Sequence, residues 1–285
     1  MKILVLGVTG MLGSAVFRQL RADSRYEVFG TMRTAAGLRH FSADSHANLQ
    51  SNVDVLDTDA LIRALGRVQP DVVVNCVGLI KQLEDAENPL AVLPLNAMLP
   101  HRLTHLCGLA RARLIHISTD CVFSGDKGMY TEDDLSDAHD LYGKSKFIGE
   151  VSGAPHAVTL RTSIIGHELG SSNALVEWFL SQSGQAKGYT KAVFSGLPTV
   201  ELARVIKDFV IPAPDLHGLY HVSVDPIDKY SLLKLVAEVY GKDIVLTPDD
   251  RVKIDRSLDS ARFRARTGYQ PPSWPELIRS MSAQR

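Results

Sequence analysis

Gly7-Val8-Thr9-Gly10-Met11-Leu12-Gly13 follows an apolar run at 3–6 and precedes a segment, 14–20, whose apolar residues have helical spacing. A strand, a glycine-rich turn and a helix in this order are typical of a dinucleotide-binding unit. The first glycine permits the turn, the second lets backbone approach a pyrophosphate, and the third permits close packing. The helix N-terminus then faces the anion. We therefore expect Gly7, Thr9, Gly10, Met11, Leu12 and Gly13 to bind a dinucleotide cofactor.

Composition narrows the class of protein. The chain has 285 residues, 45% hydrophobic and 22% charged, with a net charge of −1. This length suffices for one large α/β domain or two unequal lobes. Lys and Arg are scattered along the chain and do not form the positive cluster that is typical of proteins binding nucleic acid or a membrane surface. We therefore expect a small-molecule partner. No stretch approaches membrane-spanning length, and three cysteines without CxxC spacing favour a reducing cytoplasm.

Alternating patterns continue along the chain. Apolar, strand-like runs lie at 27–32, 72–76, 113–117 and 157–160, and helical patterns lie at 60–68, 95–109 and 142–151. This alternation predicts an α/β fold, a Rossmann-type doubly wound parallel sheet with a smaller C-terminal substrate lobe. We expect an NAD(P)-binding domain at 1–162 and a mainly substrate-binding lobe at 163–285. Residues 218–223 are expected to return to the main sheet.

The end of the second expected strand bears on cofactor choice. It reads Thr31-Met32-Arg33, without the carboxylate that often binds the ribose 2′-hydroxyl of NAD. A guanidinium can grip a 2′-phosphate with two hydrogen bonds, so Arg33 favours NADP(H). A solvated surface arginine is the alternative interpretation, and NAD(H) stays open as the cofactor.

A second set of residues suggests carbonyl reduction. Tyr142 and Lys146 are four residues apart on an expected helix and therefore share a face. A nearby ammonium stabilises phenolate, so we expect it to lower the pKa of Tyr142 and to make the phenol a usable proton donor. Thr119 follows the strand at 113–117, where an open α/β sheet places its ligand crevice. The Thr119 hydroxyl can form a hydrogen bond with the substrate carbonyl oxygen that receives the proton from Tyr142.

With these motifs the chain resembles the extended short-chain dehydrogenase/reductases, and within them the dTDP-4-dehydrorhamnose reductase group. The resemblance covers nearly the whole chain. It is carried by GVTGMLG at 7–13, PDVVVN at 70–75, Asn96, STDCVFSG at 118–125, YTED at 130–133, YGKSK at 142–146 with Glu150, LRTS at 160–163, GLPT at 196–199 and RSLD at 256–259.

The resemblance implies roles for individual residues. It makes Thr119, Tyr142 and Lys146 the catalytic triad, with Tyr142 and Lys146 also contacting the cofactor. It places further cofactor contacts at Asp54 and Val55 beside the adenine, and at Cys76, Val77, Gly78 and Asn96. It places substrate contacts at Thr119, Asp120, Cys121, Arg161, Ser163, Thr199 and Arg256.

Two segments depart from the group. After Asn75 the chain reads Leu79-Ile80-Lys81-Gln82-Leu83-Glu84-Asp85-Ala86 in place of a threonine-containing run with Val-Asp and Ala-Glu pairs. Ile164 stands where the group commonly has a Trp, which removes a stacking surface. The departures favour a different sugar, for instance a UDP-linked 4-keto-6-deoxy amino sugar, with Lys81 or Gln82 facing the altered substituent.

The leading hypothesis is NADPH-dependent reduction of a nucleotide-linked 4-keto-6-deoxyhexose for cell-surface polysaccharide precursors. An NAD-dependent epimerase or dehydratase is a rival, although Cys121 occupies the position of the dehydratases' glutamate base. A cofactor-binding regulatory subunit, like that of methionine adenosyltransferase, is the other alternative. The sequence leaves a homodimer open. We assign no metal site, since His101 and His105 lack the glutamate of the metalloprotease motif.

Overall fold

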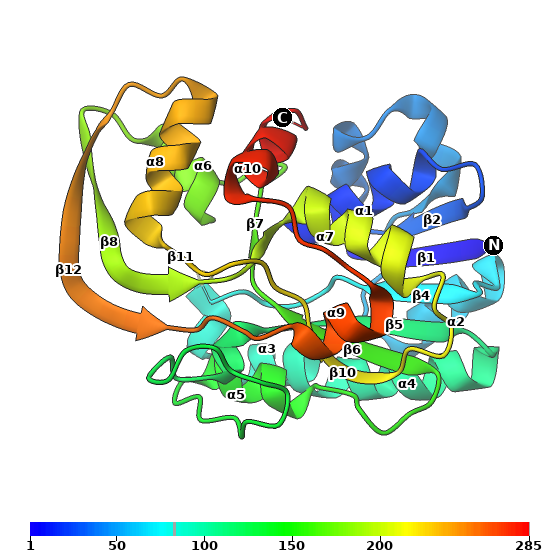
Figure 1. The fold of residues 1–285 in the computed structure, drawn as a ribbon. Coiled ribbons are helices and arrows are strands. Elements are labelled where there is room, and N and C mark those ends of the chain that lie inside the picture. Colours follow the sequence, from blue (N-terminus) through cyan, green and yellow to red (C-terminus); the bar gives the residue numbers. More distant parts are fainter. Residues whose placement is uncertain (82–83, 285) are drawn as a thin grey trace.

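A parallel sheet of seven strands forms the centre of the computed structural model, which describes residues 1–81 and 84–284 (Figure 1). The strand order is β10-β6-β5-β4-β1-β2-β3. The strands are β1 (Lys2–Leu6), β2 (Glu27–Thr31), β3 (Leu49–Gln50), β4 (Val72–Asn75), β5 (Arg113–Thr119), β6 (Ala157–Thr162) and β10 (Gly218–His221). Strand order reverses between β1 and β4, and ligands bind at the carboxyl ends of strands at such a point. The predicted doubly wound α/β fold is confirmed.

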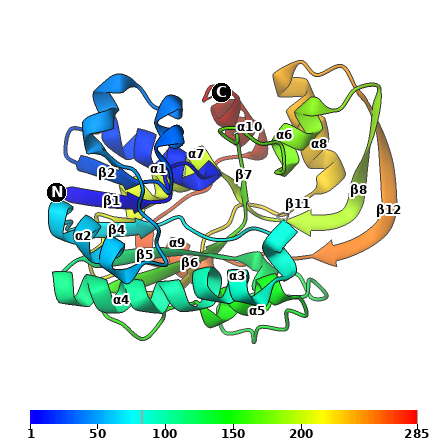
Figure 2. The ribbon, with the colours of Figure 1, turned by 180° about the vertical axis from the view of Figure 1, so that it is seen from behind.

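Alternation along the strands divides the core between the two faces of the sheet. Ile3 and Val5 of β1 pack into a cluster with residues of α1 (Met11–Arg21), α7 (Thr199–Val205) and α10 (Trp274–Ser282). Leu4 and Leu6 pack into another with residues of α2 (Thr58–Val68) and α4 (Leu99–Ala110). Successive side chains of a strand point to opposite faces, so a continuous apolar strand serves both clusters. The view from behind shows the same two helical layers (Figure 2).

A second sheet, of three strands, has the order β11-β8-β12. Its strands are β8 (Gln185–Phe194), β11 (Ile227–Asp228) and β12 (Val245–Asp255). β8 and β12 form a long bent pair away from the central sheet, beside α6 (Leu175–Ser181) and α8 (Lys229–Tyr240) (Figure 1). The short strands β7 (Ile164–Ile165) and β9 (Leu197–Pro198) pair with each other. β10 follows all of β7 to β9 in sequence yet pairs with β6 in the first sheet. The exact boundaries of the two lobes stay a prediction.

The described residues also form three further α-helices and six 3₁₀ or π-helical turns. They are α3 (Pro89–Val92), α5 (Leu141–Ile148) and α9 (Ala261–Thr267), the 3₁₀ turns η1 (Ala35–His40), η2 (Ala43–Asn48), η3 (Glu84–Glu87) and η5 (Asp120–Val122), and the π-helical turns η4 (Leu93–Met98) and η6 (Ile206–Val210). α5 ends earlier than the pattern at 142–151 predicts. A Cβ on Gly149, its C-cap residue, would lie 2.0 Å from the carbonyl oxygen of Asn96, so backbone packs closely where the helix ends.

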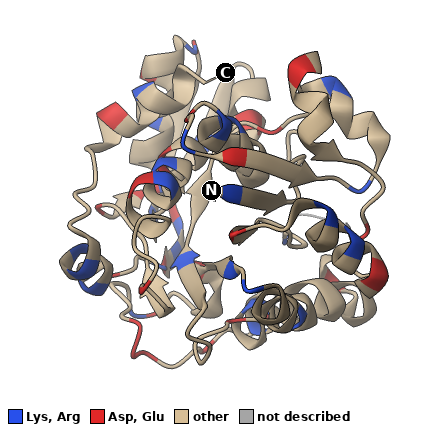
Figure 3. Ribbon diagram, turned by 90° about the vertical axis from the view of Figure 1, so that its right-hand side faces the viewer, with Lys and Arg blue, Asp and Glu red and all other residues tan. Residues whose placement is uncertain are grey.

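Charged residues are dispersed over helices and loops of the ribbon (Figure 3). Both signs are mixed, in keeping with the net charge of −1. Among the helices that the structure describes, none is long and apolar enough to cross a membrane.

Candidate active site

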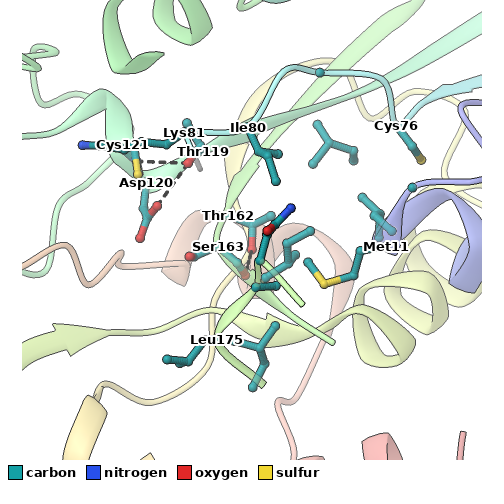
Figure 4. A pocket seen from close by; sticks show the side chains of 18 of the residues that line it. Met11, Cys76, Ile80, Lys81, Thr119, Asp120, Cys121, Thr162, Ser163 and Leu175 are labelled. Carbon is teal, nitrogen blue, oxygen red and sulfur yellow. Dashed lines mark hydrogen bonds between the residues drawn. The ribbon is translucent and has the colours of Figure 1, made fainter. Parts of the chain in front are cut away.

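A cavity of about 830 Å³ lies at the carboxyl ends of the central strands. It is lined by the glycine turn, by the loop after β4, by the end of β5, by α5 and by one end of the second sheet. Met11 lies at one end of the cavity, and Asp120 and Cys121 lie at the other (Figure 4). The fold thus brings together motifs that are more than 100 residues apart in sequence.

The three glycines of the first turn meet different surroundings. Gly7 has φ +80°, and its N–H donates to the carbonyl oxygen of Thr31 at 3.2 Å. A Cβ on Gly13 would lie 2.1 Å from the Gly7 carbonyl oxygen, so the helix contacts the strand directly. A Cβ on Gly10 would have no neighbour closer than 3.4 Å. Gly10 lines the cavity and caps α1 without a side-chain bond. Open space before an uncapped helix N-terminus fits a dinucleotide pyrophosphate.

Six predicted cofactor residues do not line the cavity: Gly7 and Gly13 of the turn, Asn96, and the three residues Arg33, Asp54 and Val55. Arg33 is exposed just beyond β2. Asp54 is exposed too, and its carboxylate accepts the backbone N–H of Leu56 at 2.9 Å. Val55 is buried in the apolar cluster of α2 and α4. The contacts of Arg33, Asp54 and Val55 with the adenosine half of a cofactor remain predictions.

Asn96 does not line the cavity as its predicted cofactor contact requires. It is buried, its Oδ1 accepts the N–H of Leu79 at 2.9 Å, and its Nδ2 donates to the Leu79 carbonyl oxygen at 3.0 Å. These two bonds satisfy the backbone of the loop that carries the lining residues Cys76, Val77 and Gly78. Asn96 therefore positions this loop from behind.

Lys81 lies in the cavity wall, but its ammonium already has a partner. Its Nζ lies 2.7 Å from Oδ2 of Asp140, and half of the Lys81 side chain is exposed. Asp140 is the N-cap of α5, and its Oδ1 accepts the N–H of Gly143 at 2.7 Å. The ion pair thus joins the loop after β4 to the helix that carries Tyr142. Gln82, the other predicted discriminator, lies outside the described residues.

Thr119, Tyr142 and Lys146 all line the cavity. Thr119 Oγ1 donates to Oδ1 of Asp120 at 3.1 Å and accepts the N–H of Cys121 at 3.1 Å. Lys146 Nζ donates to the carbonyl oxygen of Ile117 at 2.7 Å. The three predicted catalytic side chains therefore share one wall, between β5 and α5.

The expected effect of Lys146 on Tyr142 is corrected by the structure. Burial raises the pKa of the Tyr142 phenol, the Cys121 thiol adds to this rise, and a hydrogen bond with Thr119 opposes it. Desolvation is the largest contribution, so the pKa of Tyr142 lies above its ordinary value and not below it. Burial also lowers the pKa of Lys146 to about 8, against the charge of Glu150. At neutral pH the phenol is therefore protonated and can donate a proton.

Two predicted substrate residues are buried outside the cavity lining. Arg161 is 2% exposed, and its guanidinium donates to both carboxylate oxygens of Glu150, at 2.9 and 2.6 Å. It also lies over the Phe123 ring, 4.9 Å from the centroid. Thr199 is buried where α7 begins and packs against Gly166. Neither Arg161 nor Thr199 lines the cavity, because each is used in packing the interior.

Four other predicted substrate residues do line the cavity: Asp120, Cys121, Ser163 and Arg256. Arg256 Nε donates to the Phe123 carbonyl oxygen at 2.8 Å, and its Nη1 lies 3.7 Å from the Cys121 sulfur. Burial raises the pKa of the Cys121 thiol to about 12. The thiol is therefore neutral and a poor nucleophile or base.

Sequence reasoning missed Lys229 and the segment 165–175, whereas Ile164, which it singled out, does line the cavity. Lys229 lines the cavity as the first residue of α8, directly after the N-cap Asp228. A cation at a helix N-terminus opposes the helix dipole, and this is the signal that could have found it. In the missed segment, Glu168 Oε2 accepts the N–H of Ala174 at 2.6 Å and so shapes the turn before α6. No motif in the sequence marks that turn.

In the described part of the chain, no group of three or more His, Cys, Asp or Glu residues is arranged to hold a metal ion. His101 Nε2 instead forms a 2.6 Å hydrogen bond with the Ile148 carbonyl oxygen. Cys76, Cys107 and Cys121 are free cysteines.

Comparisons with known proteins find relatives over nearly the whole chain. A family model described as the RmlD substrate binding domain matches residues 1–284. The spore coat polysaccharide biosynthesis protein SpsK of Bacillus subtilis is 31% identical, over 100% of this chain and 98% of that protein. The methionine adenosyltransferase 2 subunit beta of mouse is 30% identical, over 97% and 88%.

Solved structures show the same fold. The dTDP-4-dehydrorhamnose reductase of Bacillus anthracis, in complex with NADP, has a TM-score of 0.82 at 19% identity, covering 100% of this chain and 99% of that one. The orthologue from Clostridium acetobutylicum has a TM-score of 0.81 at 23% identity, covering 100% and 99%.

Proposed function

The chain belongs to the RmlD substrate-binding domain family of extended short-chain dehydrogenase/reductases, and we propose that it reduces a nucleotide-linked 4-keto-6-deoxyhexose with NADPH. One observation carries the proposal. The glycine turn and the Thr119, Tyr142 and Lys146 side chains line one cavity, so a dinucleotide at the turn can reach a carbonyl at these side chains. The name of the Bacillus subtilis relative supports a role in polysaccharide precursor synthesis.

The cofactor would be held at the first turn of α1. The backbone of Gly10, Met11 and Leu12 faces the cavity there, and helix N–H groups favour the pyrophosphate. NADPH, when bound, supplies the hydride that is added to the sugar C4.

This chain's side chains would complete the reduction at the carbonyl oxygen. Tyr142 donates its phenolic proton to the oxygen, which becomes the C4 hydroxyl. The phenol holds its proton at neutral pH, as a proton donor must before the transfer. Thr119 orients the carbonyl by a hydrogen bond, and Lys146 places a positive charge beside the site, held by the Ile117 carbonyl oxygen. A positive charge there favours the developing alkoxide.

The sugar is proposed to be a UDP-linked amino sugar, because the loop around Lys81 departs from the reductase group. The test gives purified protein NADPH with either UDP-linked 4-keto-6-deoxy-N-acetylhexosamine or the dTDP-4-keto-rhamnose precursor, and follows absorbance. We expect faster oxidation with the amino sugar, and Lys81→Ala to reduce that difference. A preference for the dTDP sugar would reject the amino-sugar assignment.

A regulatory role is a second candidate, favoured by the 30% identity with the mouse subunit over 97% of this chain. Such a subunit would bind the dinucleotide without needing the catalytic hydroxyls. The same assay separates the two roles. Absence of oxidation with either ketosugar, together with a stable complex with a methionine adenosyltransferase in gel filtration, would establish the regulatory role.

Dehydratase chemistry is disfavoured by one position. Elimination of water needs an acid and a base beside the catalytic threonine, and Cys121 occupies the expected base position. Burial keeps its thiol neutral by raising the pKa to about 12.

A further inference from the structure

Asp120 and Lys229 reach the same cavity from different sheets. Asp120 directly follows β5 of the central sheet, and Lys229 directly follows β11 of the second sheet. Asp120 is 5% exposed, and its Oδ1 accepts the hydroxyl of Thr119. Each of the two charges acts on the other, yet among the described residues no ion pair joins them. A carboxylate and an ammonium therefore both line the cavity without forming an ion pair with each other.

Both groups are electrostatically unfavourable where they stand. Burial raises the pKa of Asp120, which the charge of Arg256 opposes, and burial lowers the pKa of Lys229. Lys229 also lies at the N-terminal end of α8, against the helix dipole. Charges kept at such a cost in a cavity are commonly functional.

An apolar corner of the cavity adjoins Lys229. The Lys229 ammonium lies 5.1 Å from the centroid of the Phe194 ring. Phe194 is paired with Ile227 of β11, and Ala192 is paired with Ile254 of β12. Phe194, Ala192 and Ile254 all line the cavity. This end of the cavity therefore offers an acceptor, a donor and an apolar surface.

We propose that this corner binds an acetamido substituent of the sugar, at C2, in the reductase proposed above. The amide N–H would donate to Asp120, the amide oxygen would accept from Lys229, and the methyl group would contact Phe194, Ala192 and Ile254. A hydroxyl at the same position has no methyl group and offers one atom where an amide offers a separate donor and acceptor. The inference rests on the proposed function and names its substrate class.

Binding tests the inference without turnover. Calorimetry would measure the affinities of the protein for UDP-N-acetylglucosamine and for UDP-glucose with NADP⁺ present. These two sugar nucleotides differ only at C2. The unaltered protein is compared with Lys229→Met, which keeps the length of the side chain without its charge. Lys234→Met is the control, since Lys234 is exposed on the same helix. Circular dichroism and NADPH affinity check that each variant is folded.

We expect the unaltered protein to bind the acetamido sugar about 10- to 100-fold more tightly, the range for losing a hydrogen bond to a charged group. Lys229→Met should remove most of this preference, and Lys234→Met should keep it. Equal affinity for the two sugars, no binding of either, or the same loss for both in Lys229→Met would overturn the inference. A failure of the proposed function would be seen in a different measurement. In that case the ketosugars would bind to the protein, but NADPH would not be oxidised.

Discussion

Lys146 Nζ donates a 2.7 Å hydrogen bond to the carbonyl oxygen of Ile117, two residues before Thr119. This bond holds a cation from α5 beneath the end of β5, inside the protein. The Lys146 side chain is 6% exposed, and burial lowers its pKa from 10.5 to about 8. The ammonium therefore carries an unfavourable free energy in the folded state.

Lys146→Met should stabilise the protein at pH 7 by about 1–2 kcal/mol. The substitution removes the free-energy cost of burying the ammonium, and the loss of its hydrogen bond to Ile117 offsets part of this gain. Below about pH 8 the lysine is charged in both the folded and the unfolded state, so the penalty is fully present. It fades as pH rises toward 10.5, where the amine is neutral in both states. Urea unfolding at several pH values measures the difference, and a variant less stable than the original protein at pH 7 would refute it.

Gly10 and Gly13 should respond differently to alanine. Gly13→Ala places a Cβ 2.1 Å from the Gly7 carbonyl oxygen, so we expect a loss of about 1–3 kcal/mol of stability through overpacking. Gly10→Ala has room for its Cβ, and its stability should change by about 0.5 kcal/mol or less. Its NADPH affinity should still fall at least about tenfold, because the methyl group occupies the approach of the pyrophosphate. Thermal unfolding measures the effect on stability, and NADPH titration measures the effect on binding. Unchanged NADPH affinity in Gly10→Ala would show that the pyrophosphate does not bind at this turn.

Arg33→Ala should weaken NADPH binding by about 10- to 100-fold and leave NADH binding nearly unchanged, since the lost contact is to the 2′-phosphate alone. Arg33 is exposed, so the protein should keep its stability. Fluorescence titration with both cofactors measures the ratio. Equal weakening of both would assign Arg33 a role unrelated to the phosphate.

Arg161→Met should destabilise the protein by about 3–5 kcal/mol, because the buried Glu150 carboxylate loses its cationic partner and keeps only the hydrogen bond from Ser118. Arg63→Met is the matched control. Arg63 is largely exposed beside Asp57, and its loss should cost less than about 1 kcal/mol. Denaturant unfolding compares the variants. If Arg161→Met lost no more stability than Arg63→Met and raised the KM for the sugar, Arg161 would be a substrate-binding residue.

The fold could be predicted from the sequence because its signals are local. Glycine spacing after an apolar strand, and strands alternating with helical patterns, specify a doubly wound sheet without knowledge of distant contacts. Element ends were less predictable. α5 ends at Ile148, where the backbone of Gly149 packs against Asn96, a contact between segments far apart in sequence.

In the candidate site, too, residues in local motifs were predictable and residues whose role depends on distant contacts were not. Thr119, Tyr142 and Lys146 belong to motifs, and the structure places all three in the cavity. The functions expected of Arg161 and Asn96 depended on where their side chains point. Arg161 turns to Glu150, and Asn96 turns to the backbone of Leu79. Lys229 is positioned by the pairing of β11 with β8, a contact between segments far apart in sequence.

The central claim is that Tyr142 donates the proton in an NADPH-dependent ketosugar reduction, and Tyr142→Phe tests it most directly. The measurement is the rate of NADPH oxidation by the purified variant with a saturating UDP-linked 4-keto-6-deoxy-N-acetylhexosamine, alongside NADPH affinity. We predict that kcat falls by about 10²–10⁴-fold while NADPH affinity stays nearly unchanged, since only the proton donor is removed. Near-normal turnover by a folded Tyr142→Phe variant would contradict the account.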